Sequence, residues 1–360
     1  MSLQAQVEPA EVRHAEELEQ LAARPGPRPP GWRLTPSAVV DFVMGDGRRV
    51  ARKFVGERAL VERAVVTLAG ERGLLLVGEP GTAKSMLSEL LAAAVSGASE
   101  RVVQGTAGTT EEHLRYGWNY RLLLAEGVSG QALVPSPILA AMRAGAVARV
   151  EEITRCLPEV QDALVSVLSE RRMAVPELGA TEYAAQGFNV IATANLRDRG
   201  VSEMSAALKR RFNFEVVPPI GTLADEVALV RTQAGAALAR AGATLEVDDA
   251  VMEALVTTFR DLRLGTAEEG WPVERPAAVM STAEAVAVAG SMGLQAAYLP
   301  VPDPLSLLPG YLLGVVRKDD PDDQGKLLAY WDTTVRRRAE SGPRLWRRLY
   351  ELRDALSGGS

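Results

Sequence analysis

An apolar run that passes directly into a glycine-rich turn sets the strictest limit on the fold of this chain. The run and the turn read LLLVGEPGTAKS, from Leu74 to Ser85. They match the pattern of a strand, a GxxxxGK[ST] turn and a helix at all but one position, because Ala83 stands where the second glycine is expected. A strand that continues through such a turn into a helix is a building unit of parallel sheets, so an α/β fold is predicted.

The chemistry of this turn suits a nucleotide phosphate, although a glycine-rich turn without a ligand is the alternative. Gly78 and Gly81 let the backbone turn sharply and point several N–H groups inward. The helix that begins near Lys84 adds its positive end, the lysine can reach the β- and γ-phosphates, and the Ser85 hydroxyl can ligate Mg²⁺. Ala83 is expected at the helix start, where ordinary helical angles suffice. The predicted ATP and Mg²⁺ site is Gly78, Glu79, Pro80, Gly81, Thr82, Ala83, Lys84 and Ser85.

Short apolar runs alternate with helical patterns from Leu34 to about Pro219, which indicates a parallel α/β sheet. The predicted strands are Gly73–Val77, Arg101–Gln104, Ala146–Val150, Phe188–Ala194 and Phe212–Val217. Alanine and leucine at helical spacing then predict helices at 222–242, 248–264 and 276–292. The predicted organisation is an N-terminal arm with a proline-rich linker (1–33), a P-loop αβα core (34–221), a smaller all-α lid (222–298) and a C-terminal extension (299–360).

Two acidic residues follow one of the predicted strands, in the segment AVARVEEI. Acids just past a strand end can lie in the crevice at the carboxyl edge of a parallel sheet, where ligands bind. We therefore predict that Glu151 serves the metal and that Glu152 orients the attacking water. The alternative is a solvated start of the next helix. Arg149 is unusual in such a strand, because buried parallel strands are normally apolar throughout.

Two further polar positions have a place in phosphate chemistry. Asn195 ends the apolar run FNVIATAN and could hydrogen-bond the γ-phosphate or the water, although a lone asparagine there is often a turn or cap residue. Lys209, Arg210 and Arg211 precede the strand FNFEVV. One of these arginines could reach the γ-phosphate of a neighbouring subunit, or all could form a solvated basic helix end.

The loop, the acid pair, the asparagine and the arginine, in this order, resemble the AAA+ ATPases, specifically the MoxR-like branch that includes the RavA and CbbQ/NorQ groups. The resemblance spans about 54–275 and rests on VGEPGTAKS, SPILAAMRAGAVARVEEITRCLPEVQDALVSVLSERR, FNVIATAN and LKRRFNFEV. It implies that Arg211 is the arginine finger and that Arg275 is the sensor-2 arginine. The chain departs from the family pattern at Glu151, where Asp is usual, and at Arg149, where an apolar residue is usual. These departures are compatible with slow hydrolysis.

The resemblance also implies two inserted β-hairpins, at Tyr120–Val134 and Met173–Tyr183. It implies a ring of six subunits with nucleotide between neighbours. The expected function is that of a chaperone-like remodeller or activator, working with a von Willebrand factor A domain protein or another client. An alternative is an ATP-dependent assembly scaffold with little hydrolysis, which Glu151 and Arg149 favour.

Composition restricts the remaining classes of function. A net charge of -6 gives no general attraction to nucleic acid, and Arg336–Arg338 is interpreted as a solvated helix face. Trp346 and Tyr350 are interpreted as packing residues. The single cysteine, Cys156, excludes an intramolecular disulfide, and no apolar stretch reaches about 18 residues. We therefore expect a cytoplasmic protein without a membrane span or a nucleic-acid partner.

Overall fold

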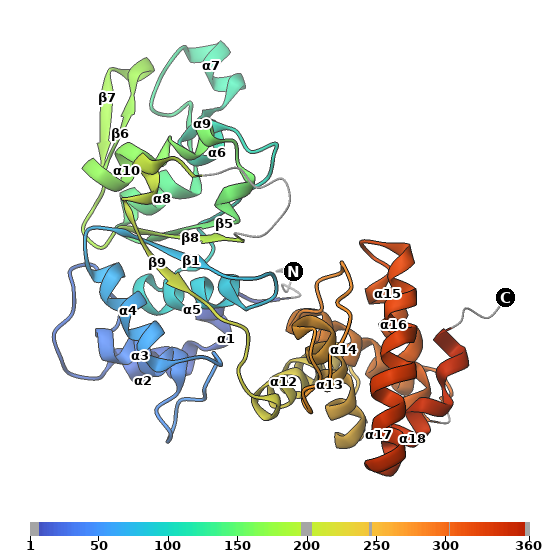
Figure 1. The fold of residues 1–360 in the computed structure, drawn as a ribbon. Coiled ribbons are helices and arrows are strands. Elements are labelled where there is room, and N and C mark those ends of the chain that lie inside the picture. Colours follow the sequence, from blue (N-terminus) through green and yellow to red (C-terminus); the bar gives the residue numbers. More distant parts are fainter. Residues whose placement is uncertain (1–6, 196–203, 245–246, 302, 357–360) are drawn as a thin grey trace. The chain divides into compact units, whose positions relative to one another are not determined.

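The computed structural model describes residues 7–195, 204–244, 247–301 and 303–356 (Figure 1). The chain forms two compact units. The first comprises Met1–Glu79 and Ala83–Pro218, and the second comprises Pro80–Thr82 and Pro219–Ser360. No helix among the described residues combines the length and the apolar character needed to cross a membrane.

A parallel five-stranded sheet organises the first unit. Its order is β2 (Val102–Gln104), β5 (Val147–Glu151), β8 (Asn189–Ala194), β1 (Gly73–Val77) and β9 (Phe212–Val216), and every neighbouring pair is parallel. All residues of β1, β5 and β8 are buried, as expected for strands covered on both faces. The sheet confirms the predicted α/β fold and all five predicted strands.

Helices cover both faces of this sheet, with α3, α4 and α5 on one side and α8 and α10 on the other (Figure 1). The helices of the first unit are α1 (Ala10–Arg13), α2 (Ala15–Ala22), α3 (Pro36–Met44), α4 (Arg58–Ala69), α5 (Lys84–Ser96), α6 (Glu111–Leu114), α7 (Tyr120–Glu126), α8 (Pro137–Ala144), α9 (Pro158–Gln161), α10 (Leu164–Glu170) and α11 (Ala206–Lys209). Alternate residues of β1 contribute to the apolar clusters on the two faces of the sheet. Leu74 and Leu76 pack with α3–α5, whereas Leu75 and Val77 pack with α8 and α10.

Two antiparallel hairpins project from the first unit. The hairpin β6 (Arg172–Val175) with β7 (Ala180–Tyr183) confirms the insertion predicted at Met173–Tyr183. The second predicted hairpin is wrong in its extent, because β4 (Leu133–Pro135) pairs with β3 (Tyr116–Trp118), upstream of the predicted range. The apolar run that was expected to be a strand forms α7 instead. The Asn119 side chain caps this helix by accepting from the Leu122 N–H, and Gly127 ends it with φ 76°.

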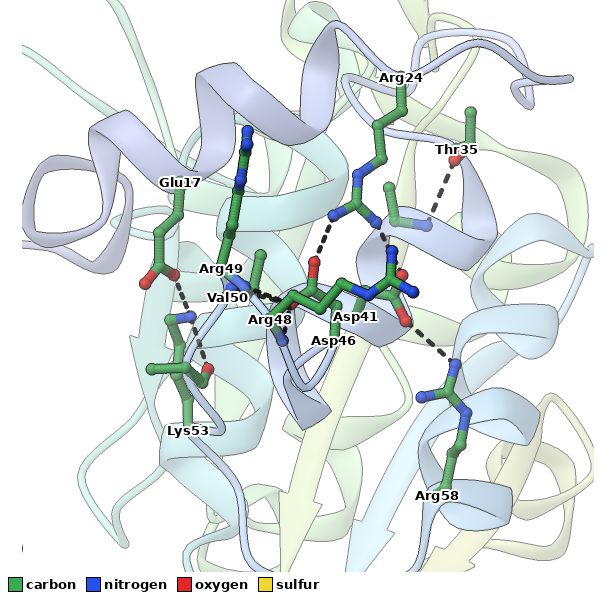
Figure 2. Close-up of polar contacts among 12 residues, drawn as sticks. Glu17, Arg24, Thr35, Asp41, Asp46, Arg48, Arg49, Val50, Lys53 and Arg58 are labelled. Carbon is green, nitrogen blue, oxygen red and sulfur yellow. Dashed lines mark hydrogen bonds and ion pairs between the residues drawn. The ribbon is translucent and has the colours of Figure 1, made fainter.

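Residues 7–33 are attached to the rest of the first unit by ion pairs (Figure 2). Arg24 reaches Asp41 at 2.8 Å and Asp46 at 2.7 Å, and Lys53 pairs with Glu17. Backbone N–H groups of residues 48–50 hold the pKa of the Asp46 carboxyl well below its usual range. Apolar contacts contribute too, because Leu18, Leu21 and Trp32 are buried in the same cluster as α3–α5. Residues 7–33 thus pack on the core instead of extending from it.

The second unit is helical. Its helices are α12 (Leu223–Arg240), α13 (Asp249–Leu264), α14 (Thr282–Tyr298), α15 (Leu308–Val316), α16 (Gln324–Tyr330), α17 (Arg336–Ser341) and α18 (Arg344–Glu351). The helix predicted from Pro276 begins later, because Ser281 caps it by accepting from the Glu284 N–H. One apolar cluster extends from Val230 to Leu356, so the ranges predicted as lid and extension share a core.

Arg338 corrects the expectation of a solvated helix face at Arg336–Arg338. Arg336 and Arg337 are exposed, but Arg338 is buried and donates to Asp261 at 2.7 Å and to Glu269 at 2.6 Å. Its guanidinium also lies 4.6 Å from the centre of the Trp346 ring. The partners of Arg338 lie 69 and 77 residues away, so local charge patterning could not reveal this burial. The predicted packing roles of Trp346 and Tyr350 are confirmed.

Candidate nucleotide-binding site

The glycine-rich loop connects β1 to α5, as predicted. The Gly78 N–H donates to the Ala194 carbonyl at 3.3 Å, which places the start of the loop beside the end of β8. Gly81 has φ 76°, a conformation that favours glycine. The Lys84 ammonium donates to the carbonyls of Gly78 (3.1 Å) and Glu79 (2.7 Å), so it lies against the loop where a phosphate would be held.

Ala83 corrects one expectation about this loop. The residue does not have helical angles but lies in the left-handed region, with φ 63° and ψ 24°. The backbone has to reverse its curvature between the loop and the first turn of α5, and glycine does this without strain. For an L-residue the same conformation costs roughly 1–2 kcal/mol. The observed angles explain why the consensus has glycine at this position, and they predict that alanine is less favourable there.

Replacing Ala83 by glycine should stabilise the chain. Ala83→Gly is expected to raise the free energy of unfolding by about 1 kcal/mol, because relief of the left-handed strain outweighs the greater entropy of the unfolded glycine. Urea denaturation measures the change. Ala93→Gly, in the buried interior of α5, is the matched control and should lower the same free energy by about 1 kcal/mol or more. A loss of stability in both variants would contradict the strain at Ala83.

Glu151 ends β5 and is buried, facing the first turns of α5. Its Oε2 atom accepts from the hydroxyls of Ser85 (2.6 Å) and Thr193 (2.8 Å), and its Oε1 atom accepts from the Ser88 hydroxyl (2.5 Å). Burial raises the pKa of this carboxyl, but the hydrogen bonds and a neighbouring positive charge outweigh burial and lower the pKa overall. Glu151 is therefore a carboxylate held against Ser85.

Arg149 supplies that positive charge. Its side chain alternates with Val150 along β5, so it shares a face of the sheet with Glu151. Its Nη2 atom donates to Glu151 Oε1 at 2.8 Å, and the guanidinium also donates to the Ser85 and Ser99 carbonyls, both at 3.0 Å. The arginine that was unusual in the sequence is thus paired and hydrogen-bonded inside the unit, as a buried charge has to be.

Glu152 lies directly after β5, in a left-handed conformation with φ 53°. Its N–H donates to the Thr193 hydroxyl at 2.9 Å, which fixes the turn. The half-exposed carboxylate is 2.9 Å from the Arg155 guanidinium and 3.3 Å from the Gln104 amide nitrogen. Asn195 follows β8 and is buried at the same edge of the sheet. The structure thus brings together the loop, both acids and the asparagine.

Arg211 lies at the other edge of the sheet. It precedes β9, and its carbonyl accepts from the N–H of Gly73, the first residue of β1. The five residues of β1 advance about 3.3 Å each, so about 16 Å separates this point from the loop. The Arg211 guanidinium donates to the Ser169 hydroxyl and the Ala207 carbonyl. Arg211 therefore does not meet the loop of its own unit.

Arg275 is exposed in the segment between α13 and α14 of the second unit, where its side chain lies close to Gly265. Its role at a nucleotide stays a prediction.

The residues at the loop fit Mg²⁺. The Ser85 hydroxyl gives its proton to Glu151, so its oxygen lone pairs remain available to a metal. Hydroxyl and carboxylate oxygens are the ligands that Mg²⁺ prefers, and the ion usually completes its shell with substrate phosphates and water. The described part of the chain has no group of three or more His, Cys, Asp or Glu side chains able to hold a metal.

Ser88, Thr193 and Gln104 also contact the two acids and were not singled out from the sequence. Spacing offered a signal for two of them. Ser88 lies three residues after Ser85 and so shares its face of α5, and Thr193 lies two residues before Asn195 on β8. Gln104 is brought to Glu152 by the pairing of β2 with β5, which no local pattern encodes.

Comparison with known families accounts for both units. The model described as AAA domain (dynein-related subfamily) matches residues 73–212, and the model of the YehL-like AAA+ ATPase C-terminal domain matches residues 224–357. The protein YehL of Escherichia coli strain K12 is 47% identical over 355 residues, which are 97% of each chain. A protein of Staphylococcus haemolyticus strain JCSC1435 is 31% identical over 194 residues, 53% of this chain and 68% of that one. The crystal structure of NtrX from Brucella abortus has a TM-score of 0.48 at 15% identity and covers 83% of this chain and 69% of its own.

The AAA domain match includes the loop, the acid pair and the strand that ends before Asn195, and the second match covers the helical unit. The predicted AAA+ resemblance is confirmed at this level, whereas the MoxR-like branch stays a prediction. The similarity to the Escherichia coli protein extends over both units. The chain therefore belongs to the YehL-like AAA+ ATPases.

Proposed function

We propose that this chain binds ATP with Mg²⁺ at the loop Gly78–Ser85 and hydrolyses it. The observation that supports the proposal is the pair of hydrogen bonds that the Ser85 and Thr193 hydroxyls donate to Glu151. A hydroxyl that could ligate a metal and a carboxylate thus lie together at the carboxyl edge of the sheet. When bound, Mg²⁺ would neutralise phosphate charge that develops during transfer. Glu152, at the same edge, would orient the attacking water and accept its proton.

Arg211 supports the further proposal of a site shared between subunits. Because it lies at the opposite edge from its own loop, it can serve a γ-phosphate only on another copy of the chain. A guanidinium suits this role, since its planar fork pairs with phosphate oxygens and stays charged. We propose a homo-oligomeric ring, six-membered by the resemblance given above. In the MoxR-like manner, the ring would remodel or activate a client protein, such as a von Willebrand factor A domain protein.

An ATP-dependent scaffold with little hydrolysis is the second candidate. Two ion pairs favour it: Arg149 with Glu151 at 2.8 Å, and Arg155 with Glu152 at 2.9 Å. Each places a positive charge on an acid that hydrolysis would use. Measured turnover with Mg²⁺ separates the scaffold from the ATPase, because both bind ATP.

Lys84 tests the nucleotide site that both candidates share. Lys84→Ala should weaken ATP binding at least tenfold, or about 1.4 kcal/mol, because the ammonium that faces the phosphates is lost. Isothermal titration calorimetry with ATP and Mg²⁺ measures the affinity. Lys318→Ala removes an exposed lysine that pairs with Glu284 in the second unit, and should leave the affinity unchanged. Equal ATP affinity in a folded Lys84→Ala protein would contradict the assignment of the loop.

A further inference from the structure

The carboxylate of Glu151 is satisfied on both oxygens by groups of its own chain. Ser85 and Thr193 donate to Oε2 at 2.6 and 2.8 Å, and Ser88 and Arg149 donate to Oε1 at 2.5 and 2.8 Å. One of these four donors carries a full positive charge. The acid that faces the metal position is therefore already neutralised before any cation arrives.

Arg149 is fixed in this position. Its guanidinium makes four hydrogen bonds, to the Ser88 hydroxyl (2.9 Å), the carbonyls of Ser99 and Ser85 (3.0 Å each) and Glu151 (2.8 Å). Only 11% of its side-chain surface is exposed. Leaving the pocket would break all of these bonds and would strand Glu151 as an unpaired buried charge, which is strongly unfavourable. The positive charge is thus a permanent part of the nucleotide site.

The two neighbours of Glu151 that matter here lie on different oxygens. Its two oxygens face different neighbours: Oε2 takes the Ser85 hydroxyl that would ligate the metal, and Oε1 takes the guanidinium. A positive charge beside one carboxylate oxygen also reduces the negative potential at the other oxygen. Inside a protein such charge interactions are screened far less than in water. Arg149 therefore weakens the attraction of the site for a dication and adds attraction for the phosphates.

We propose that Arg149 is a resident counter-ion of Glu151 that takes over part of the role of Mg²⁺, so that the loop binds ATP with little dependence on the metal. This inference rests on the proposed function, since it concerns the same nucleotide site. It assigns to Arg149 a positioning role: the arginine acts through Glu151 and sets the affinity of the site for the cation.

The experiment compares ATP affinity in excess Mg²⁺ with ATP affinity in EDTA, measured by isothermal titration calorimetry. For the unmodified protein, chelation of Mg²⁺ should weaken ATP binding tenfold or less. Arg149→Gln removes the charge but keeps an amide that can donate to Ser88, the partner of Arg149 Nε. Chelation should then weaken ATP binding at least tenfold more than in the unmodified protein, a difference of about 1.4 kcal/mol. Arg149→Lys keeps the charge and should retain the weak metal dependence.

Results that overturn the counter-ion role differ from those that overturn the proposed function. An unmodified protein that binds ATP, but loses more than tenfold in affinity on chelation, overturns the counter-ion role and leaves the proposed function intact. The counter-ion role is likewise overturned if Arg149→Gln binds ATP with an unchanged dependence on Mg²⁺. No binding of ATP to the unmodified protein, with or without Mg²⁺, overturns the proposed function itself. Should Arg149→Gln not fold, the dependence measured on the unmodified protein decides alone.

Discussion

Glu152→Gln should lower the rate of ATP hydrolysis by about 10²- to 10⁴-fold while ATP still binds. The substitution keeps the shape of the side chain but removes its ability to take a proton from the attacking water. The position is well defined for this role, because the Glu152 N–H is tied to Thr193 and the residue follows β5 directly. Phosphate release measures turnover, and calorimetry confirms that the nucleotide is retained.

The control for this prediction is Glu159→Gln, which changes an exposed acid on α9 and should leave turnover unaffected. Glu151→Gln separates the roles of the adjacent acids. It should impair Mg²⁺-dependent steps, because it alters the partner of Ser85. If Glu151→Gln stops turnover and Glu152→Gln does not, the two roles are reversed. Normal turnover in both variants would show that the acids lie outside the chemistry.

Arg211→Ala should abolish turnover, by roughly 10³- to 10⁵-fold, and spare ATP binding. The reason is geometric. Arg211 lies before β9, at the edge of the sheet opposite to the loop, so its own nucleotide does not depend on it. A neighbouring subunit's γ-phosphate would lose the charge that stabilises the transition state. Arg210→Ala changes the exposed neighbouring arginine and is the matched control, with turnover expected to persist.

Mixing the two inactive variants tests whether Arg211 acts between subunits. Glu152→Gln has an intact finger and Arg211→Ala has an intact acid, so some mixed interfaces combine both. Partial turnover should return when the two proteins are combined. Mixing without recovery, with exchange of subunits shown by a labelled chain, counts against a finger in trans unless turnover needs an uninterrupted ring. Full turnover of Arg211→Ala alone would remove the assignment and make Arg210 the next residue to test.

The sheet and the polar residues at its carboxyl edge could be predicted from sequence because their signals are local. The strands are short and mostly apolar, and the polar residues Glu151 and Asn195, at the ends of β5 and β8, mark the carboxyl edge. The angles of Ala83 could not be predicted in this way. The motif has glycine at this position, and Ala83 adopts the left-handed angles that favour glycine, with φ 63°.

The partners of buried charged residues were the second feature that could not be predicted from the sequence. Arg149 stood out as unusual in a strand, but its partners Ser88 and Ser99 come from α5 and the turn after it, 50 to 61 residues away. Arg338 was hidden among exposed arginines for the same reason. A chain can bury such a residue only where the fold supplies its partners, and sequence spacing does not report distant partners. The hairpin expected at Tyr120–Val134 failed differently, because an apolar run of this length suits a helix as well as a strand.

The most direct test of a shared ATPase site is the rate of phosphate release per chain, measured with ATP and Mg²⁺ over a wide range of protein concentration. Lys84→Ala serves as the blank for contaminating activity, and light scattering follows the oligomeric state. A site completed by Arg211 of a neighbour predicts that the rate per chain rises with concentration and levels off once the oligomer has formed. A rate per chain that stays constant down to the monomer, or one that never exceeds the Lys84→Ala blank, would contradict a site of this kind.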